Sequence, residues 1–178
     1  MGRVLRLCPD RPLVFLLQRI DRMDVTVRWM VRQDLADVLE IENLSFLHPW
    51  DADIYRENLK SRSCLPLVAE LSDGTIIGYV IYTLGDTDIT IINMAVHPDY
   101  KGNRVASQMI NKIKGKLNDH RSHILIAVAD YNLECQLFLR HHQFKAIEVA
   151  REHFIGGVDA YWFQFKSKVS RPYPERTK

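Results

Sequence analysis

The stretch Asn93-Met-Ala-Val-His-Pro-Asp-Tyr-Lys-Gly-Asn-Arg-Val-Ala-Ser-Gln-Met-Ile110 decides how the rest of the chain is arranged. The apolar run 89–96 predicts a strand that ends at Pro98. A helix is expected from near Asn103, because apolar residues recur there at helical spacing: Val105, Ala106, Met109, Ile110, Ile113 and Leu117. The loop between them carries Lys101 and Gly102. A loop of this kind points several backbone N–H groups at one spot, which also feels the positive end of the helix dipole and is therefore a favourable place for a pyrophosphate.

The segment Val96-His-Pro-Asp-Tyr-Lys-Gly-Asn-Arg-Val-Ala106 resembles the acetyl-CoA-binding motif of the GNAT N-acetyltransferases, roughly V-x-P-x-Y-R/Q-x-x-G-x-G/A. The matching residues are Val96, Pro98, Tyr100 and Ala106, and Lys101 stands where the family prefers Arg or Gln. Arg104 departs from the motif, since the family usually has Gly there. If the loop needs a positive φ at this residue, Arg costs about 1–2 kcal/mol. The alternative is an ordinary strand–helix turn of an α/β domain.

Length and composition exclude several classes of protein. A chain of 178 residues suits one domain plus a tail or two. The 24 basic and 22 acidic residues give no argument for a nucleic-acid partner. Cys8, Cys64 and Cys135 are widely spaced, so we expect no disulfide framework, no metal site and a reducing cytoplasm. No apolar run approaches the ~20 residues of a membrane helix, so no membrane partner is expected.

The two ends of the chain are predicted to lie outside the domain. The apolar segment Pro12–Leu17 follows Arg3 and Arg6, but it is too short for a signal peptide and lacks a small-residue cleavage site. Met23 is an alternative start. We therefore expect an N-terminal extension or leader over 1–24, a domain over 25–166, and a loose, basic tail over 167–178.

The first half of the domain predicts an antiparallel meander with two helices before it. A strand is expected over 25–31, followed by a helix whose periodic face is Leu35, Val38, Leu39 and Glu42. Asp51 is placed to cap a second helix. Strands over 66–71 and 76–84, joined by a turn at 72–75, then pair with the central strand.

The second half predicts the remaining strands. The strand 123–129 should pair with the central strand in parallel, because a helix lies between them. The segment 131–142 is predicted to be a helix with Leu133, Leu137 and Phe138 inward, and strands follow over 144–150 and 159–165. This order is that of the GNAT acyl-CoA N-acyltransferase fold: an α/β domain with a mixed sheet, splayed between the fourth and fifth strands and flanked by helices. An unrelated mixed α+β domain is the alternative.

Three further segments resemble the RimI-type branch of that family, the ribosomal-protein-alanine N-acetyltransferases. Ser45-Phe-Leu-His-Pro-Trp50 is similar to its F-x-x-P-W element, and Ile92-Asn-Met-Ala-Val-His-Pro98 is similar to its central strand. The segment 130–144 is similar to its A-S-N-x-x-A-x-x-L-Y-x-x-x-G-F element, with Asn132 and Phe144 matching.

The resemblance implies where acetyl-CoA binds. Backbone groups of Met94, Ala95 and Val96 would hold the pantetheine arm. The pyrophosphate would lie beside Lys101 and the N–H groups of Gly102, Asn103, Arg104, Val105, Ala106 and Ser107. Asn132 would bond the cofactor near the splayed strands, although its position suits a helix N-cap equally well.

The catalytic pair of the branch is not present. Ala127 stands where the branch usually has the Glu that acts as general base, and Leu139 stands where it has the Tyr that protonates the thiolate. Candidate replacement bases are Asp130, Asp88 and His153, of which we predict Asp130 and His153 as catalytic, and Tyr131 is a candidate acid.

Three functions remain open from the sequence. The first is direct acetyl transfer, in a ternary complex, from acetyl-CoA to a protein N-terminal amine of the ribosomal-protein-alanine type. The second is acetylation of a small amine, and the third is acyl-CoA binding without catalysis, as a sensor. The protein is expected to be a monomer or a weak homodimer. No bound metal is expected.

Overall fold

The computed structural model describes residues 23–61 and 63–168, without the side chain of Leu59. Almost all of the predicted N-terminal extension, and the predicted tail after Lys168, lie outside the described residues. The strands are β1 (Val25–Trp29), β2 (Cys64–Leu71), β3 (Ile76–Leu84), β4 (Asp88–Val96), β5 (His123–Ala129), β6 (Lys145–Phe154) and β7 (Val158–Lys166). The helices are η2 (Arg32–Asp34), α2 (Leu35–Ser45), α3 (Ala52–Lys60), η3 (Pro98–Tyr100), α4 (Val105–Lys114) and α5 (Leu133–His141).

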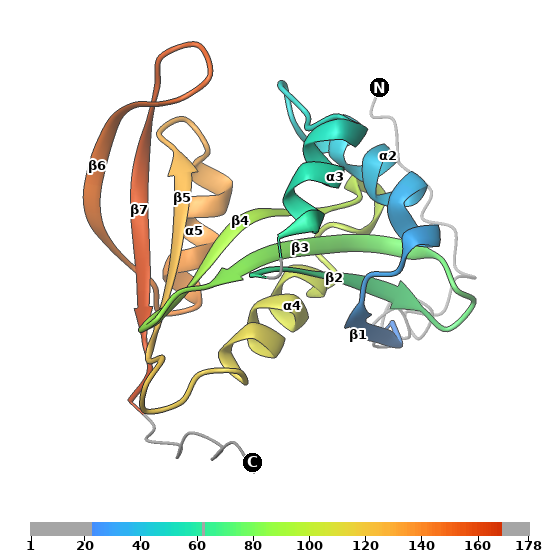
Figure 1. Ribbon diagram of the computed structural model, residues 1–178, viewed down its shortest axis with the longest axis horizontal. Helices are drawn as coiled ribbons and strands as arrows, with labels where there is room; N and C mark the ends of the chain where they lie inside the picture. The colour runs from blue at the N-terminus through green and yellow to red at the C-terminus, as the bar shows by residue number, and fades with distance from the viewer. Residues whose placement is uncertain (1–22, 62, 169–178) are drawn as a thin grey trace, which may run out of the picture.

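The described strands form one mixed sheet in the order β1-β2-β3-β4-β5-β7-β6. Strands β1 to β4 are antiparallel neighbours, as the meander predicts. Strand β5 pairs with β4 in parallel, but only over Asp88–Ile91 and His123–Ile126. Beyond these residues the two strands diverge, as Figure 1 shows at the centre of the molecule. The predicted splay between the fourth and fifth strands is therefore confirmed.

Strand β4 carries one extra residue at the point where it leaves β5. Ile81 pairs with Asn93 and Tyr82 pairs with Ile91, so the intervening Ile92 has no partner of its own in β3. Such a bulge bends a strand and turns its following backbone groups away from the regular ladder. The bulge therefore lies at the opening between β4 and β5.

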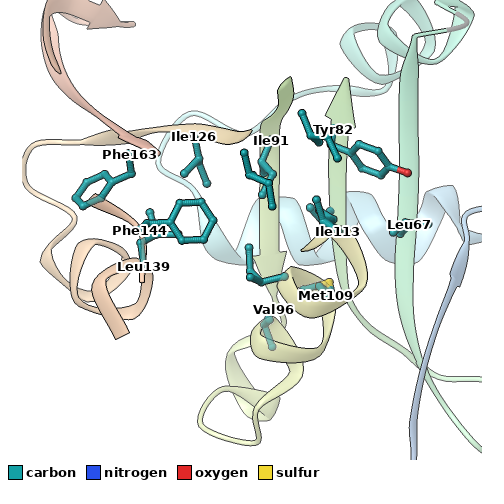
Figure 2. Packing of buried hydrophobic residues seen from close by; sticks show 14 of the residues in the cluster. Leu67, Tyr82, Ile91, Val96, Met109, Ile113, Ile126, Leu139, Phe144 and Phe163 are labelled. Carbon is teal, nitrogen blue, oxygen red and sulfur yellow. The ribbon is translucent and has the colours of Figure 1, made fainter. Parts of the chain in front are cut away.

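Helices cover both faces of the sheet (Figure 1). Helices α2 and α3 pack on one face, where Val38, Ile41 and Tyr55 are buried against β2 and β3. The predicted apolar stripe of α4 packs on the other face, and Figure 2 shows Met109 and Ile113 of that helix against the strands. Leu139 of α5 belongs to the same cluster. This second core thus joins the two helices that follow the strands of the splay.

The prediction for the inward face of α5 is partly wrong. Leu133 and Leu137 are 61% and 53% exposed, whereas Leu139 is fully buried and Phe138 and Cys135 are half-buried. Apolar residues lie on two stripes of the helix, so their spacing in the sequence does not show which stripe is buried. Contact with Phe144 and Phe163 selects the stripe that contains Leu139. Strand β1 also ends two residues earlier than predicted, at Trp29.

Candidate active site

A cavity of about 330 Å³ is lined by residues from the splay to the start of α4. Its wall includes Met94, Ala95 and Val96 of β4, and its far end is formed by Lys101, Gly102 and Arg104. The first turn of α4 contributes Val105, Ala106 and Ser107. Ten of the eleven residues predicted to bind acetyl-CoA therefore line one cavity. The eleventh, Asn103, lies in the same loop and donates its side-chain amide to the carbonyls of Tyr100 and Lys101.

The loop before α4 leaves the first N–H groups of the helix available to an anion. Arg104 is the N-cap residue, with φ 62° and ψ 15°, and its side chain caps no backbone group. Gly102 also has a positive φ, of 78°. The expected requirement for a left-handed residue at position 104 is thus present, and Arg meets it at a cost of about 1–2 kcal/mol. Gln143, where the resemblance places Gly, is left-handed as well, with φ 66°.

Charged side chains surround the loop end of the cavity. Lys101 and Arg104 supply positive charge beside the helix N-terminus, which suits a pyrophosphate. Glu134 of α5 lines the same end, and Lys101 Nζ lies 3.5 Å from its carboxylate. The ion pair spans the two sides of the cavity, so a diphosphate would compete with Glu134 for Lys101.

Ser45 supplies a polar group without a partner at the other end of the cavity. Its Oγ is buried and makes no hydrogen bond with any residue in the described ranges. Ser45 and Phe46 line the cavity opposite β4. A buried hydroxyl without a partner is costly, and an amide of a bound pantetheine arm would satisfy it. The cavity, its positive end and this hydroxyl together fit acetyl-CoA.

A second cavity, of about 210 Å³, opens on the face of the sheet that carries α2 and α3. Its lining comes from α2 and the loop after it (Glu42, Phe46, His48, Trp50), from β4 (Ile91, Ile92, Asn93, Met94), from β5 and the loop after it (Ile126, Ala127, Val128, Ala129, Tyr131, Asn132), and from Cys135 and Phe154. Phe46, Met94, Asn132 and Cys135 line both cavities. The two cavities therefore adjoin at the bulge of β4.

A buried carboxylate organises the wall of this second cavity. Glu42 is 1% exposed and accepts hydrogen bonds from the N–H of Trp50 at 2.8 Å and the hydroxyl of Tyr55 at 3.1 Å. The hydroxyl of Tyr79 and the side-chain amide of Asn93 also donate to it. Burial raises the pKa of Glu42 above its ordinary value of 4.5, although its hydrogen bonds oppose that rise. An acidic residue on the periodic face of the predicted helix was the sequence signal for this group.

Asn132 combines the two roles that the sequence left open. Its side-chain oxygen accepts the N–H of Cys135 at 3.1 Å, which caps α5. The residue also lines both cavities. Its side-chain NH₂ group is chemically able to donate to a ligand while the oxygen caps the helix.

The two residues predicted to be catalytic lie outside the lining of both cavities. Neither Asp130 nor His153 lines either cavity, although their neighbours Tyr131 and Phe154 line the second one. His153 is exposed and its ring lies edge-on to Trp162, 5.6 Å between centroids. Asp88 is the first residue of β4, in the part of the strand that pairs with β5, and it accepts a hydrogen bond from the hydroxyl of Thr90. Ala127 lines the second cavity, and Leu139 is fully buried in the core.

Cys135 lies between the two cavities, but burial makes its thiol a poor nucleophile. Desolvation, together with nearby Glu134, raises its pKa to about 11. The residues of 23–61 and 63–168 contain no group of three or more His, Cys, Asp or Glu side chains arranged to hold a metal. Within the same ranges, no helix has the length and apolar character needed to cross a membrane.

Comparison with known proteins identifies the family. Residues 35–144 match the family model described as the acetyltransferase (GNAT) family. A Bacillus subtilis (strain 168) protein, provisionally named a [ribosomal protein bS18]-alanine N-acetyltransferase, is 39% identical over 77 residues. That alignment spans 43% of this chain and half the length of the relative.

Solved structures show the same fold. The ribosomal-protein-S18-alanine N-acetyltransferase of Escherichia coli has a TM-score of 0.73 at 17% identity, covering 85% of this chain and 97% of the other. The spermidine/spermine N-acetyltransferase SpeG of Vibrio cholerae has a TM-score of 0.63 at 19% identity, covering 80% and 92%. At these identities the likeness establishes the fold alone. The match to the family model extends from α2 to the end of α5 and includes every residue that lines the first cavity, and the chain belongs to the GNAT family of acetyltransferases.

Proposed function

We propose that this protein is an acetyl-CoA-dependent N-acetyltransferase that acts on the N-terminal α-amine of a protein, by direct transfer in a ternary complex. The observation that carries the proposal is the meeting of two cavities at the β4 bulge. The lining and the charged residues of one cavity suit acetyl-CoA, and the other cavity opens beside it. Two substrates held in adjacent cavities can react directly, and alignment alone can lower the barrier by up to roughly 7–11 kcal/mol.

The residues of the chain would position the donor. Lys101, Arg104 and the first turn of α4 would hold the pyrophosphate. The backbone of Met94 to Val96 and the hydroxyl of Ser45 would hold the pantetheine arm. A backbone N–H at Met94 or Val96 would then polarise the thioester carbonyl. In the reaction the amine nitrogen forms a bond to the carbonyl carbon, the carbon–sulfur bond breaks, and the thiolate leaves with a proton.

The absence of a carboxylate at position 127, where the branch usually has its general base, supports an α-amine rather than a more basic amine. An α-amine has a pKa of about 7.7–8.0, so roughly half of it is neutral near pH 8. A lysine ε-amine, with a pKa near 10.4, is more than 99% protonated there. Ala127 supplies no base, and the carboxylate of Glu42 already accepts hydrogen bonds from four donor groups. A substrate that arrives neutral therefore suits this site best.

The lining of the second cavity also disfavours a polyamine. Glu42 is its one acidic residue among those the structure describes, and that carboxylate is buried. A polycation would need several exposed carboxylates. Instead, Phe46, Ile92 and Phe154 are each about a third exposed around the opening, as an apolar rim for a peptide chain. The name of the Bacillus subtilis relative supports a ribosomal-protein acceptor with an N-terminal Ala.

Glu42 is proposed as a positioning residue. It holds Asn93 at the bulge and Trp50 in the loop after α2, and both border the acceptor. Asp130 and His153, next to residues that line the second cavity, remain the proposed acceptors of the proton that the nitrogen loses after it has attacked the carbonyl. A cytoplasmic location and a monomeric or weakly dimeric state are parts of the same proposal.

One observation favours a second candidate, an acyl-CoA-binding protein without catalysis. The position of the usual catalytic Glu is Ala127, in the wall of the acceptor cavity. Calorimetric titration with acetyl-CoA, followed by a thiol-release assay on peptides and small amines, separates the two. Micromolar binding with turnover on a peptide that starts with Ala or Ser supports the enzyme. Binding without turnover on any amine supports the second candidate, and absence of binding rejects both.

A further inference from the structure

The inner end of the second cavity is hydrocarbon. Ile91, Ile126 and Val128 line it and are only 2%, 7% and 4% exposed. Ile91 and Ile126 are the last paired residues before β4 and β5 diverge. Figure 2 shows their side chains close to each other in the same core layer, above Leu139 and Phe144. The bottom of the splay is therefore a slot between branched aliphatic side chains.

The polar lining is at the other end of the cavity. Glu42, His48 and Trp50 come from α2 and the loop that follows it, and Tyr131 is 70% exposed. An amine and the peptide attached to it need hydrogen-bond partners, which the aliphatic end does not offer. A polar acceptor is therefore expected to stay at the opening. Burial at the aliphatic end is favourable only for an apolar group.

The passage between the two cavities leads to this slot. The passage is bordered by Met94 and Cys135, and the thioester of a bound donor would lie there. Ala127 points to the opposite face of β5 from Ile126 and Val128, so the small, uncharged side chain in place of the Glu usual in the branch widens the approach to the slot. An acyl chain pointing away from the sulfur would enter between Ile91 and Val128.

We propose that the splay is an acyl-chain slot, and that the protein accepts donors with short alkyl chains, such as propionyl- and butyryl-CoA, at least as well as acetyl-CoA. This inference rests on the proposed function, since it concerns the same site. The transfer is balanced as for acetyl: the amide C–N bond forms, the thioester C–S bond breaks, and the CoA thiolate leaves with the proton lost by the amine.

The first test measures binding by the wild-type chain, which needs no acceptor. CoA, acetyl-CoA and butyryl-CoA are titrated by calorimetry under one set of conditions. Each methylene buried in the slot should tighten binding about fourfold, so butyryl-CoA should bind on the order of tenfold more tightly than acetyl-CoA. Equal or weaker binding of butyryl-CoA overturns the inference.

Variants of Val128 test the slot in both directions. Val128→Leu should shorten the slot and remove the advantage of butyryl-CoA, while Val128→Ala should extend the preference to hexanoyl-CoA. The matched controls are Val149→Leu and Val149→Ala, on an exposed part of β6 outside both cavities, which should leave the ratio unchanged. Thermal unfolding identifies the variants that fold. If folded Val128 variants keep the wild-type ratio, the inference is wrong.

Turnover separates this inference from the proposed function. If the protein uses acetyl-CoA and its kcat/KM for propionyl-CoA is at least tenfold lower, the acyl-chain slot is refuted and the proposed acetyltransferase activity is retained. If no donor is used with any amine, the enzyme is refuted, and the binding ratio still decides on the slot. Comparable kcat/KM for acetyl, propionyl and butyryl donors supports both.

Discussion

The side-chain amide of Asn93 donates to both carboxylate oxygens of Glu42, at 3.1 and 3.2 Å. A buried acid on α2 thereby holds the residue next to the bulge of β4. The same carboxylate accepts the N–H of Trp50, in the loop that borders the second cavity. One side chain thus fixes two walls of the proposed active site relative to each other.

Replacing Glu42 by Ala should lower the free energy of unfolding by roughly 3–5 kcal/mol. The change leaves the hydroxyl of Tyr55 and the amide of Asn93 without their acceptor, whereas the hydroxyl of Tyr79 can still donate to the side-chain oxygen of Asn93. Chemical denaturation measures the effect. Glu40→Ala, on an exposed position of the same helix, should change stability by less than about 0.5 kcal/mol. Equal effects of the two changes would contradict the role of the network.

The Glu42 carboxyl should also make stability depend on pH. Its pKa is raised in the folded state by burial, so the folded chain holds this proton more tightly than the unfolded chain. The contribution is therefore fully present below pH 4.5 and is lost as the pH rises through the raised pKa. Glu42→Gln should remove this component, which is measured as the difference between the two unfolding curves over pH 4–8. A constant difference across that range would refute the raised pKa.

Arg104→Gly should stabilise the free protein by about 1 kcal/mol. The residue has φ 62°, where Gly avoids a strain of about 1–2 kcal/mol, and the greater freedom of Gly in the unfolded chain offsets part of that gain. Thermal denaturation is the measurement. Arg104→Ala provides the control, because Ala has the same strain and also lacks the charge. If Ala stabilises as much as Gly, the charge and not the backbone is responsible.

Ser45→Ala should weaken acetyl-CoA binding several-fold without destabilising the free protein. The hydroxyl is buried and makes no hydrogen bond within the described part of the chain, so its removal costs the free form nothing. Calorimetry and unfolding are compared on the same samples. Ser72→Ala, on an exposed turn, is the control for both measurements. Destabilisation of the free form with unchanged affinity would show that Ser45 has only a structural role.

The rate should follow the protonation of the acceptor amine. We expect kcat/KM for an N-terminal peptide to rise through an apparent pKa near 8 and to keep that pKa in His153→Ala and Asp130→Asn. A peptide with a blocked N-terminus and one Lys should react on the order of 100-fold more slowly at pH 8. If either substitution abolishes the rise, that side chain is the general base, and the argument for a neutral incoming amine fails.

Much of the fold follows from local patterns in the sequence. The stripe of α4, the cap at Asp51 and the parallel pairing after the crossover are all predicted from spacing and connection length, and the structure confirms them. Asp51 accepts the N–H groups of Asp53 and Ile54, as an N-cap should. The left-handed backbone at Arg104 could be predicted because the conformation of this loop is set by a short segment.

The remaining features depend on contacts between distant segments. The burial of Leu139 rather than Leu137 is decided by Phe144 and Phe163, which no local pattern includes. Glu42 gathers donors from α3, β3, β4 and the loop after α2. Its position on the periodic face indicated burial, but its partners lie 8 to 51 residues away along the chain.

The short parallel pairing has a mechanical consequence. Strands β4 and β5 share only four pairs of residues, so the segment before the crossover and the segment after it are joined by a narrow seam, with α4 and α5 below it. A ligand lying along the splay touches both sides of that seam. The binding free energy of the ligand therefore also stabilises the contact between the two halves of the chain. The ligand-bound protein should resist mechanical unfolding and proteolysis better than the ligand-free protein.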